Sequence, residues 1–447
     1  MPDQVGGMED QQAECRCIDV QGSPTVTLTH RHTFALKNNM LSGVTLPAWL
    51  SFLWRHGGRL DWWPYAPRIG FLTLLSAVNS LLAVPDWVLM RRRVAATHLH
   101  PDPVFILGHP RTGTTHLHNL LSRDARFACV DTLAAGFPSA FLTLGPALAR
   151  LAAPLLDPTR PMDAMALSFQ TPAEDEIAVC ALTGIHGPPN SVRPGGTSPY
   201  MPLVMMRDQA LFQPYYQLES ASAADTARWL DAFTWFLKKV TLRAGGHKPL
   251  LLKSPVHTAR VPLLLKLFPR AKFIYIHRDP YTVRGPRVWG WLAAPVHGES
   301  AVPRQGPAVA RTGTQRRLDP PISHGPPVSG TCAHTPHPNQ TPQVFSSAAH
   351  MADSYYPYTA LQRMTPPDVT RFILDQFSLL HDAYQAAKPL IPPGNLVEVS
   401  FAELEADAVG TLRSIYDRLG LAGFDRVEPD VQHYCSTLAD FKKNDLE

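Results

Sequence analysis

The sequence lacks the features that mark several classes of protein. Its 447 residues carry 41 basic and 37 acidic side chains, so the net charge is only +4 and no polybasic field indicates a nucleic-acid partner. Its six cysteines are scattered and form no CxxC pair, which argues against a disulfide framework or a structural zinc site. We therefore expect neither a metal nor a nucleic acid among its ligands.

The chain also has little that would direct it into a membrane. Its first twenty residues include acidic side chains and no apolar run, so they do not form a signal peptide. The one candidate for membrane contact is the apolar stretch 69–85, which is at the short limit for a span. We expect a packed or membrane-surface helix there, with a true span as the alternative. The expected location is cytoplasmic or membrane-associated.

Proline is abundant but unevenly placed. The segment 283–343 holds eleven of the 44 prolines and no Lys, Phe, Tyr or Met, a composition typical of disorder. We predict that it is a Pro/Gly-rich disordered insertion in a main domain formed by 101–282 and 344–447. A disordered tail, 1–38, and a helical region, 39–100, precede that domain.

Short apolar runs alternate with helical patterns along the main domain. This alternation predicts an α/β fold with a central parallel sheet flanked by helices. The expected strands are 103–108, 250–252, 272–277 and 395–400, and the expected helices include 233–242, 261–268, 368–387 and 403–419.

A glycine-bounded turn, GHPRTGTT at 108–115, separates the first strand from a helical segment. Such a turn directs backbone N–H groups at an anion. Its spacing is that of a Walker A loop, but Thr114 stands where the lysine that reaches the β- and γ-phosphates is expected. We therefore expect the loop to hold a 5′-phosphate bearing one further charged group, which Arg111 neutralises, instead of a triphosphate with magnesium.

Two further segments follow predicted strands. Lys253 and His257 belong to the run KSPVH, and Arg278 lies in HRDPYTV, directly after the strand 272–277. The carboxyl ends of strands are where doubly wound sheets bind ligands.

Together these pieces resemble the PAPS-dependent sulfotransferases, whose donor is 3′-phosphoadenosine-5′-phosphosulfate. PRTGTT is similar to that family's 5′-phosphosulfate loop, and HRDPYTV to the start of its 3′-phosphate motif. KSPVH, RPMD (160–163) and PAEDE (172–176) resemble the large bacterial-and-eukaryotic branch. The resemblance covers roughly 40–283 and 344–425, and it implies a P-loop NTPase-like sulfotransferase fold.

The resemblance implies in-line transfer of the sulfuryl group of PAPS to a hydroxyl or amine, without a metal. A carbohydrate acceptor is the first expectation, and a lipid, a small metabolite or a protein tyrosine stays open. Lys253 would donate to the bridging oxygen, and Glu174 or His257 would be the general base. The residues expected to bind PAPS are Arg111, Thr112, Gly113, Thr114, Thr115, Arg278 and Ser347.

The 3′-phosphate motif is interrupted in this chain. The family pattern needs a serine eight positions after Arg278, on the same face of a helix, but Pro286 occupies that position. Joining Thr282 directly to Val344 gives HRDPYTVFSSAAHM and places Ser347 at the eighth position. The intervening segment therefore interrupts a motif that is otherwise complete.

We interpret the insertion 283–343 as a retained in-frame intron or gene-model error. Every codon for Val283 begins with GT, the nucleotides with which an intron starts. Gln343 can be encoded by CAG, whose last two nucleotides are those with which an intron ends. The rival interpretation is a genuine disordered loop at the rim of the site. Sequencing spliced transcripts across both junctions separates the two.

Two other functions stay open at this point. One is a catalytically impaired sulfotransferase-like protein, since a translated insertion is expected to weaken or abolish PAPS binding. The other is a P-loop kinase or NTPase, which magnesium-dependent ATP hydrolysis would reveal.

Overall fold

The computed structural model describes residues 26, 39–160, 162–163, 165–183, 198–278 and 343–438. The predicted tail 1–38 and insertion 283–343 lie outside the described residues, apart from Val26 and Gln343. Their disorder and the intron interpretation stay predictions.

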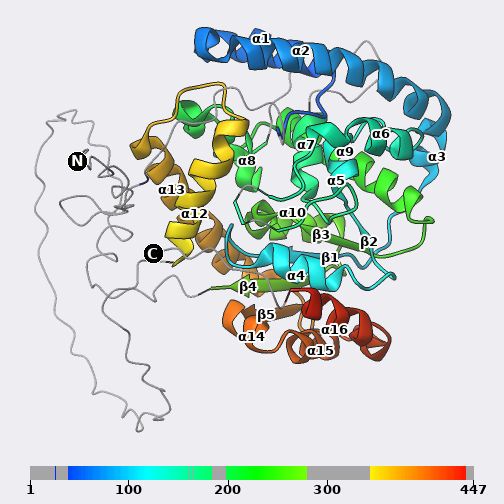
Figure 1. Ribbon diagram of the computed structural model, residues 1–447. Helices are drawn as coiled ribbons and strands as arrows, with labels where there is room; N and C mark the ends of the chain where they lie inside the picture. Colours follow the sequence, from blue (N-terminus) through cyan, green and yellow to red (C-terminus); the bar gives the residue numbers. More distant parts are fainter. Residues whose placement is uncertain are drawn as a thin grey trace, which may run out of the picture. The chain divides into compact units, whose positions relative to one another are not determined.

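A five-stranded parallel sheet forms the centre of the fold, in the order β2-β3-β1-β4-β5 (Figure 1). The strands are β1 Val104–Leu107, β2 Ala128–Cys129, β3 Leu250–Lys253, β4 Lys272–His277 and β5 Leu396–Ser400. This sheet, flanked by helices, confirms the predicted α/β class. Only β2 was not predicted, because two residues leave no readable pattern.

Both faces of the sheet are buried, which explains why its strands are continuous apolar runs. Along β1, Phe105 and Leu107 join the core on one face, and Val104 and Ile106 join the core on the other. The first face is covered by α5 Thr132–Gly136, α7 Asp175–Leu182, α9 Ala223–Arg243, α10 Val261–Leu267 and α13 Pro366–Ala387. The second is covered by α4 Thr114–Leu121, α14 Phe401–Ala406, α15 Ala408–Arg418 and α16 Glu428–Thr437.

The prediction of one helix over 403–419 was wrong, because the chain forms α14 and α15 there. Asp407 separates them with extended backbone angles (φ −147°, ψ 89°), and its side chain accepts a hydrogen bond from the Gly410 N–H. Aspartate competes with helical backbone bonding in this way and favours helix starts.

The predicted helical region 39–100 contains α1 Leu46–His56 and a long helical stretch, Trp62–Ala96, at the upper edge of Figure 1. That stretch consists of α2 Trp62–Pro85, a π-helical segment η2 Asp86–Met90, and α3 Arg91–Ala96. By length and composition alone it could cross a membrane.

The remaining helices are α6 Gly145–Leu151, α8 Pro214–Gln217 and α12 Gln343–Tyr355. The short 3₁₀ turns are η1 Gly57–Arg59, η3 Ala153–Leu155, η4 Met201–Leu203, η5 Met206–Phe212, η6 Pro255–Ala259, η7 Tyr356–Tyr358, η8 Lys388–Leu390 and η9 Phe424–Arg426.

Two histidines near the phosphate loop are buried in neutral form. His109 stacks on Phe377 with ring centroids 4.3 Å apart, and His118 in α4 is fully buried. Burial is the main cause that lowers the pKa of each ring to about 3. In the unfolded chain both rings accept a proton near pH 6.5.

We therefore predict that the protein loses stability as the pH falls below 6.5. The unfolded state binds more protons than the folded state between pH 6.5 and about 3, so the stabilisation is complete above pH 6.5 and is lost below it. Each histidine would contribute a loss of roughly 1.4 kcal/mol per pH unit in that window. Urea unfolding at pH 7.5, 6.5, 5.5 and 4.5 measures this, and a constant midpoint would contradict it.

Candidate active site

The phosphate loop has a backbone that only glycine allows at two positions. Gly113 has φ +94°, and a Cβ there would lie 2.3 Å from the Phe401 ring. Gly108 has φ +148°, and a Cβ there would lie 2.5 Å from the Ile276 carbonyl oxygen. Helix α4 begins at Thr114, so the N–H groups of its first turn have no acceptor within the helix and can bind an anion.

The structure brings together residues predicted to bind the nucleotide from distant parts of the chain. Arg111 donates from Nε to the Oγ of Ser347, 2.8 Å away and 236 positions later in α12. The guanidinium of Arg278 lies over the Phe401 ring, 4.7 Å from its centre. Burial lowers the pKa of Arg278, and the charge of Arg111 contributes to that shift. Guanidinium groups bind anionic oxygens well, so both arginines can contribute to an anion site.

The predicted loop threonines divide into two groups. Thr112 is buried and donates from Oγ1 to the His109 carbonyl at 2.8 Å, so its side chain supports the turn and does not face a ligand. Thr114 and Thr115 line a pocket together with Arg111. Among the loop threonines, only Thr114 and Thr115 therefore have side chains in the pocket wall.

Three consecutive carboxylates at the start of α7 each pair with a basic side chain of segment 253–260, which contains the end of β3 and η6. We call this arrangement the carboxylate ladder. The pairs are Glu174 with Lys253, Asp175 with His257, and Glu176 with Arg260, each with 2.6 Å between nitrogen and oxygen.

The inner two pairs are fully buried. His257 donates from its Nε2–H to the Asp175 carboxylate and is packed between the rings of Phe105 and Phe233. Burial opposes ionisation of Asp175, but His257, Ser254 and a backbone N–H together lower its pKa. The structure thus places His257, a predicted base, in the core and outside the pocket wall.

Glu176 and Arg260 form the innermost pair, and their other polar atoms are also bonded. Glu176 accepts hydrogen bonds from the Ser198 hydroxyl at 2.8 Å and the Trp229 indole at 3.2 Å. Arg260 donates to two backbone carbonyls, those of Tyr215 and Tyr216. A buried ion pair is tolerated when its remaining donors and acceptors are satisfied in this way.

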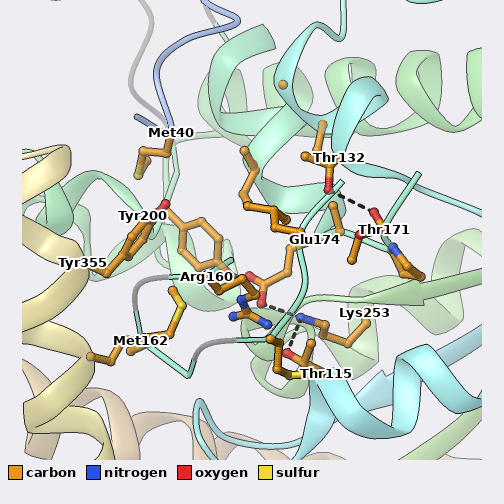
Figure 2. Close-up of a pocket in the computed structure, with 18 of the residues that line it drawn as sticks. Met40, Thr115, Thr132, Arg160, Met162, Thr171, Glu174, Tyr200, Lys253 and Tyr355 are labelled. Carbon is orange, nitrogen blue, oxygen red and sulfur yellow. Dashed lines mark hydrogen bonds and ion pairs between the residues drawn. The ribbon is translucent and has the colours of Figure 1, made fainter. Parts of the chain in front are cut away.

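The outer pair faces the pocket (Figure 2). Lys253 is 3% exposed and donates from Nζ to Glu174 Oε1 at 2.6 Å and to Thr115 Oγ1 at 3.3 Å. Tyr200 donates its hydroxyl hydrogen to the other oxygen of Glu174. Burial lowers the pKa of Lys253, and burial together with Glu174 raises that of Tyr200 well above its usual value.

The pocket has a volume of about 290 Å³, and most of its wall is apolar. Apolar lining residues include Met40, Phe137, Met162, Leu167, Phe169, Ile177, Leu203, Met351 and Phe372. Lys253, Glu174 and Thr115 meet at one place in the wall, with Arg160 beside them, while Thr132 and Thr171 lie apart from them in Figure 2. This arrangement suits a largely apolar molecule with one polar reacting group.

Sequence reasoning missed several functional side chains of this site. Asp163 forms an ion pair with Arg111 at 3.0 Å, and Arg160 lies in the pocket wall. Both residues belong to the RPMD motif, which could have identified them as candidate site residues. Tyr200 and Tyr355 also line the pocket, but no motif surrounds either of them.

The residues predicted to bind the donor offer a helix N-terminus and two guanidiniums, which are groups that bind phosphate. Arg111 lies just before that helix N-terminus and is bonded to Ser347, while Arg278 lies over Phe401. Ser346, beside Ser347, is buried, and its Oγ finds no hydrogen-bond partner among the described residues. A phosphate oxygen would satisfy such a group. Within the described residues there is no cluster of three His, Cys, Asp or Glu side chains able to hold a metal.

Comparison with known families identifies the family of the protein. The family model described as "Sulfotransferase family" matches residues 103–184, 188–291 and 339–426, more than half of the chain. The protein therefore belongs to the sulfotransferase family. The unmatched segment 292–338 lies inside the predicted insertion 283–343.

Individual relatives agree with this family. The chain is 27% identical over 414 residues to proteins named omega-hydroxy-beta-dihydromenaquinone-9 sulfotransferase Stf3 from Mycobacterium bovis and Mycobacterium tuberculosis, covering 91% of this chain and 84% of theirs. The crystal structure of sulfotransferase STF9 from Mycobacterium avium superposes with a TM-score of 0.50 at 15% identity, over 83% of this chain and 77% of that one. That likeness shows the fold alone.

We predict that Glu176→Gln unfolds far more easily than Glu174→Gln. Removing the charge of Glu176 leaves Arg260 buried without a counter-ion, which costs roughly 3–5 kcal/mol. Glu174 borders the pocket, a glutamine oxygen there can still accept from Lys253, and Lys253, whose pKa burial already lowers, can lose its proton, so we expect a smaller loss. Urea unfolding of both variants tests this, and equal losses would show that the inner pair has no special structural role.

Proposed function

We propose that this protein transfers the sulfuryl group of PAPS to a hydroxyl group of an apolar, lipid-like acceptor. One observation carries the proposal: Lys253 bonds both to Thr115 on the phosphate-loop helix and to Glu174 in the pocket wall. A single buried cation therefore connects the expected donor site with the expected acceptor site.

Support for PAPS as donor comes from the family and from the charges of the site. The 5′ end would bind the first turn of α4 and Arg111, and the 3′-phosphate would bind Arg278 and Ser347. Thr114 occupies the position of the lysine that a kinase or NTPase needs, and the family match does not favour that alternative.

The side chains supply the charge and proton transfers that the reaction needs. Glu174 accepts the proton of the acceptor hydroxyl as the new sulfur–oxygen bond forms. Lys253 donates to the bridging oxygen as the bond between sulfur and the 5′-phosphate oxygen breaks, which stabilises the leaving phosphate. The products are the sulfate ester, adenosine 3′,5′-bisphosphate and one proton, initially on Glu174.

Glu174 is favoured over His257 as the base because of position. Its carboxylate is 23% exposed and lies in the pocket wall, whereas His257 is completely buried against Asp175. A general base must come within hydrogen-bond reach of the proton it removes. We therefore assign His257 the role of holding the carboxylate ladder in position.

Support for a lipid-like acceptor comes from the wall of the pocket and from the relatives. The wall includes methionine, phenylalanine and leucine side chains, which offer a sugar few hydrogen bonds. The relatives are named for a sulfotransferase acting on a hydroxylated dihydromenaquinone. The carbohydrate acceptor expected from the family stays an untested prediction.

Glu174→Gln should lower kcat by at least about a hundredfold, because general-base catalysis commonly contributes that much. Nucleotide affinity should stay within about twofold, since Glu174 does not belong to the phosphate-binding residues. The assay follows transfer of radiolabelled sulfate from PAPS to a long-chain isoprenoid alcohol, with Arg413→Ala, a change on the exposed surface of α15, as control.

Unchanged kcat in Glu174→Gln would remove this residue from the mechanism. If the parent protein transferred sulfate to sugars and not to the isoprenoid alcohol, the proposed acceptor class would be wrong.

A further inference from the structure

Helix α2 and the following segment η2 have an unusual distribution of side chains. A surface helix normally turns its apolar side to the core and its polar side to water. Here every exposed residue from 62 to 89 is apolar or glycine. They are Trp62, Trp63, Ala66, Pro67, Gly70, Leu74, Val78, Leu81, Val84, Trp87, Val88 and Leu89. We call them the outer face of α2–η2.

The inner side of the same helix carries its polar residues, and these bind the rest of the protein. Arg68 donates to the Ala360 carbonyl at 2.6 Å. Asn79 donates to two backbone carbonyls of the segment before α1, and Asp86 forms a buried ion pair with Lys239 of α9 at 2.8 Å. The helix is thus attached to the protein at both ends by buried charged groups, with its apolar side outward.

This attachment argues against a helix that leaves the protein to cross a bilayer. Insertion would break the bond of Arg68 and the buried pair of Asp86 and would place both side chains in hydrocarbon. A helix lying in the plane of the membrane surface keeps these bonds and buries only its outer face.

The charges and tryptophans around the outer face fit an anionic lipid surface. Residues 41–100 contain six arginines and only two acidic residues, Asp61 and Asp86, and among these charged residues Arg68 and Asp86 are buried. Three of the arginines, Arg91, Arg92 and Arg93, are exposed directly after the outer face. Tryptophans stand at both of its ends, and tryptophan and arginine are typical of helices that lie at the lipid interface.

The same helix is bonded to the rim of the pocket. Met40 and Ser42 line the pocket, and the Ser42 carbonyl accepts the hydrogen bond from Asn79 of α2 at 2.5 Å. The Leu46 N–H that begins α1 donates to Ser80, also on α2, at 2.8 Å. A membrane bound to the outer face would therefore lie on the helix that supports one wall of the acceptor pocket.

We propose that the outer face of α2–η2 docks on the surface of an anionic lipid bilayer, with α2 in the membrane plane, so that an amphiphilic acceptor reaches the pocket from the lipid. Of the alternatives that the sequence left open for 69–85, this proposal chooses a helix on the membrane surface. The delivery of acceptor rests on the proposed function, whereas the docking itself does not.

The test is flotation of the full chain with vesicles of phosphatidylcholine containing 30% phosphatidylglycerol, compared with phosphatidylcholine alone. We expect binding to the anionic vesicles, and a decrease of at least tenfold in the partition coefficient of Leu74→Gln/Leu81→Gln. These two side chains are 69% and 73% exposed, so their replacement should leave the fold intact. Circular dichroism and the thermal midpoint of the variant check that its fold is intact.

Leu374→Gln/Leu390→Gln is the matched control, because it changes two exposed leucines far from α2 in sequence and should bind as the parent does. Arg92→Gln/Arg93→Gln should lose about fivefold affinity per arginine for the anionic vesicles, and increasing salt should have the same effect.

Absence of parent binding, or equal binding by Leu74→Gln/Leu81→Gln, overturns the proposal. Resistance of the bound protein to extraction at pH 11 would show a span instead of a surface helix. A dimer in solution that Leu74→Gln/Leu81→Gln dissociates would show that the face binds a second copy. Binding of the product nucleotide, measured on the same samples, tests the proposed function separately. The membrane-docking proposal and the proposed function can therefore be contradicted independently.

Discussion

The carboxylate ladder between the start of α7 and segment 253–260 is the interaction on which the site depends. Its two inner pairs, Asp175–His257 and Glu176–Arg260, are sealed in the core and fix the register between the helix and the end of β3. Because the three carboxylates are consecutive, that register also determines where Glu174 meets Lys253. The carboxylate ladder thus serves both the fold and the proposed chemistry. Of its three pairs, only Glu174–Lys253 borders the pocket.

The ladder also connects the two halves of the proposed reaction. Lys253 extends from it to Thr115 in the first turn of the phosphate-loop helix, while Glu174 and Tyr200 extend into the acceptor pocket. Buried charges are costly unless they are paired, so a lysine with lowered pKa and a carboxylate held against it form a site prepared for proton and charge transfer.

Sequence patterns predicted the sheet and the phosphate loop but not the ladder. Strand β4 was predicted with its exact bounds, because an apolar run stands between clear breaks. Which carboxylate faces the pocket depends on a register between segments about eighty residues apart, which no local pattern records. Tyr200 could not be found for the same reason. Ser347 contacts Arg111, and its predicted role beside Arg278 at the 3′-phosphate stays a prediction.

The central claim is that the donor site is assembled from both sides of the insertion, and calorimetric titration with adenosine 3′,5′-bisphosphate tests it directly. Since Ser347 already contacts Arg111 in the full chain, we expect binding by the full chain and by a form lacking 283–343. Arg111→Ala and Ser347→Ala should each bind at least tenfold more weakly, and Arg413→Ala should not. Binding by the shortened form alone would show that the insertion disrupts the site. Binding by neither form, or undiminished binding by both site variants, would contradict the claim.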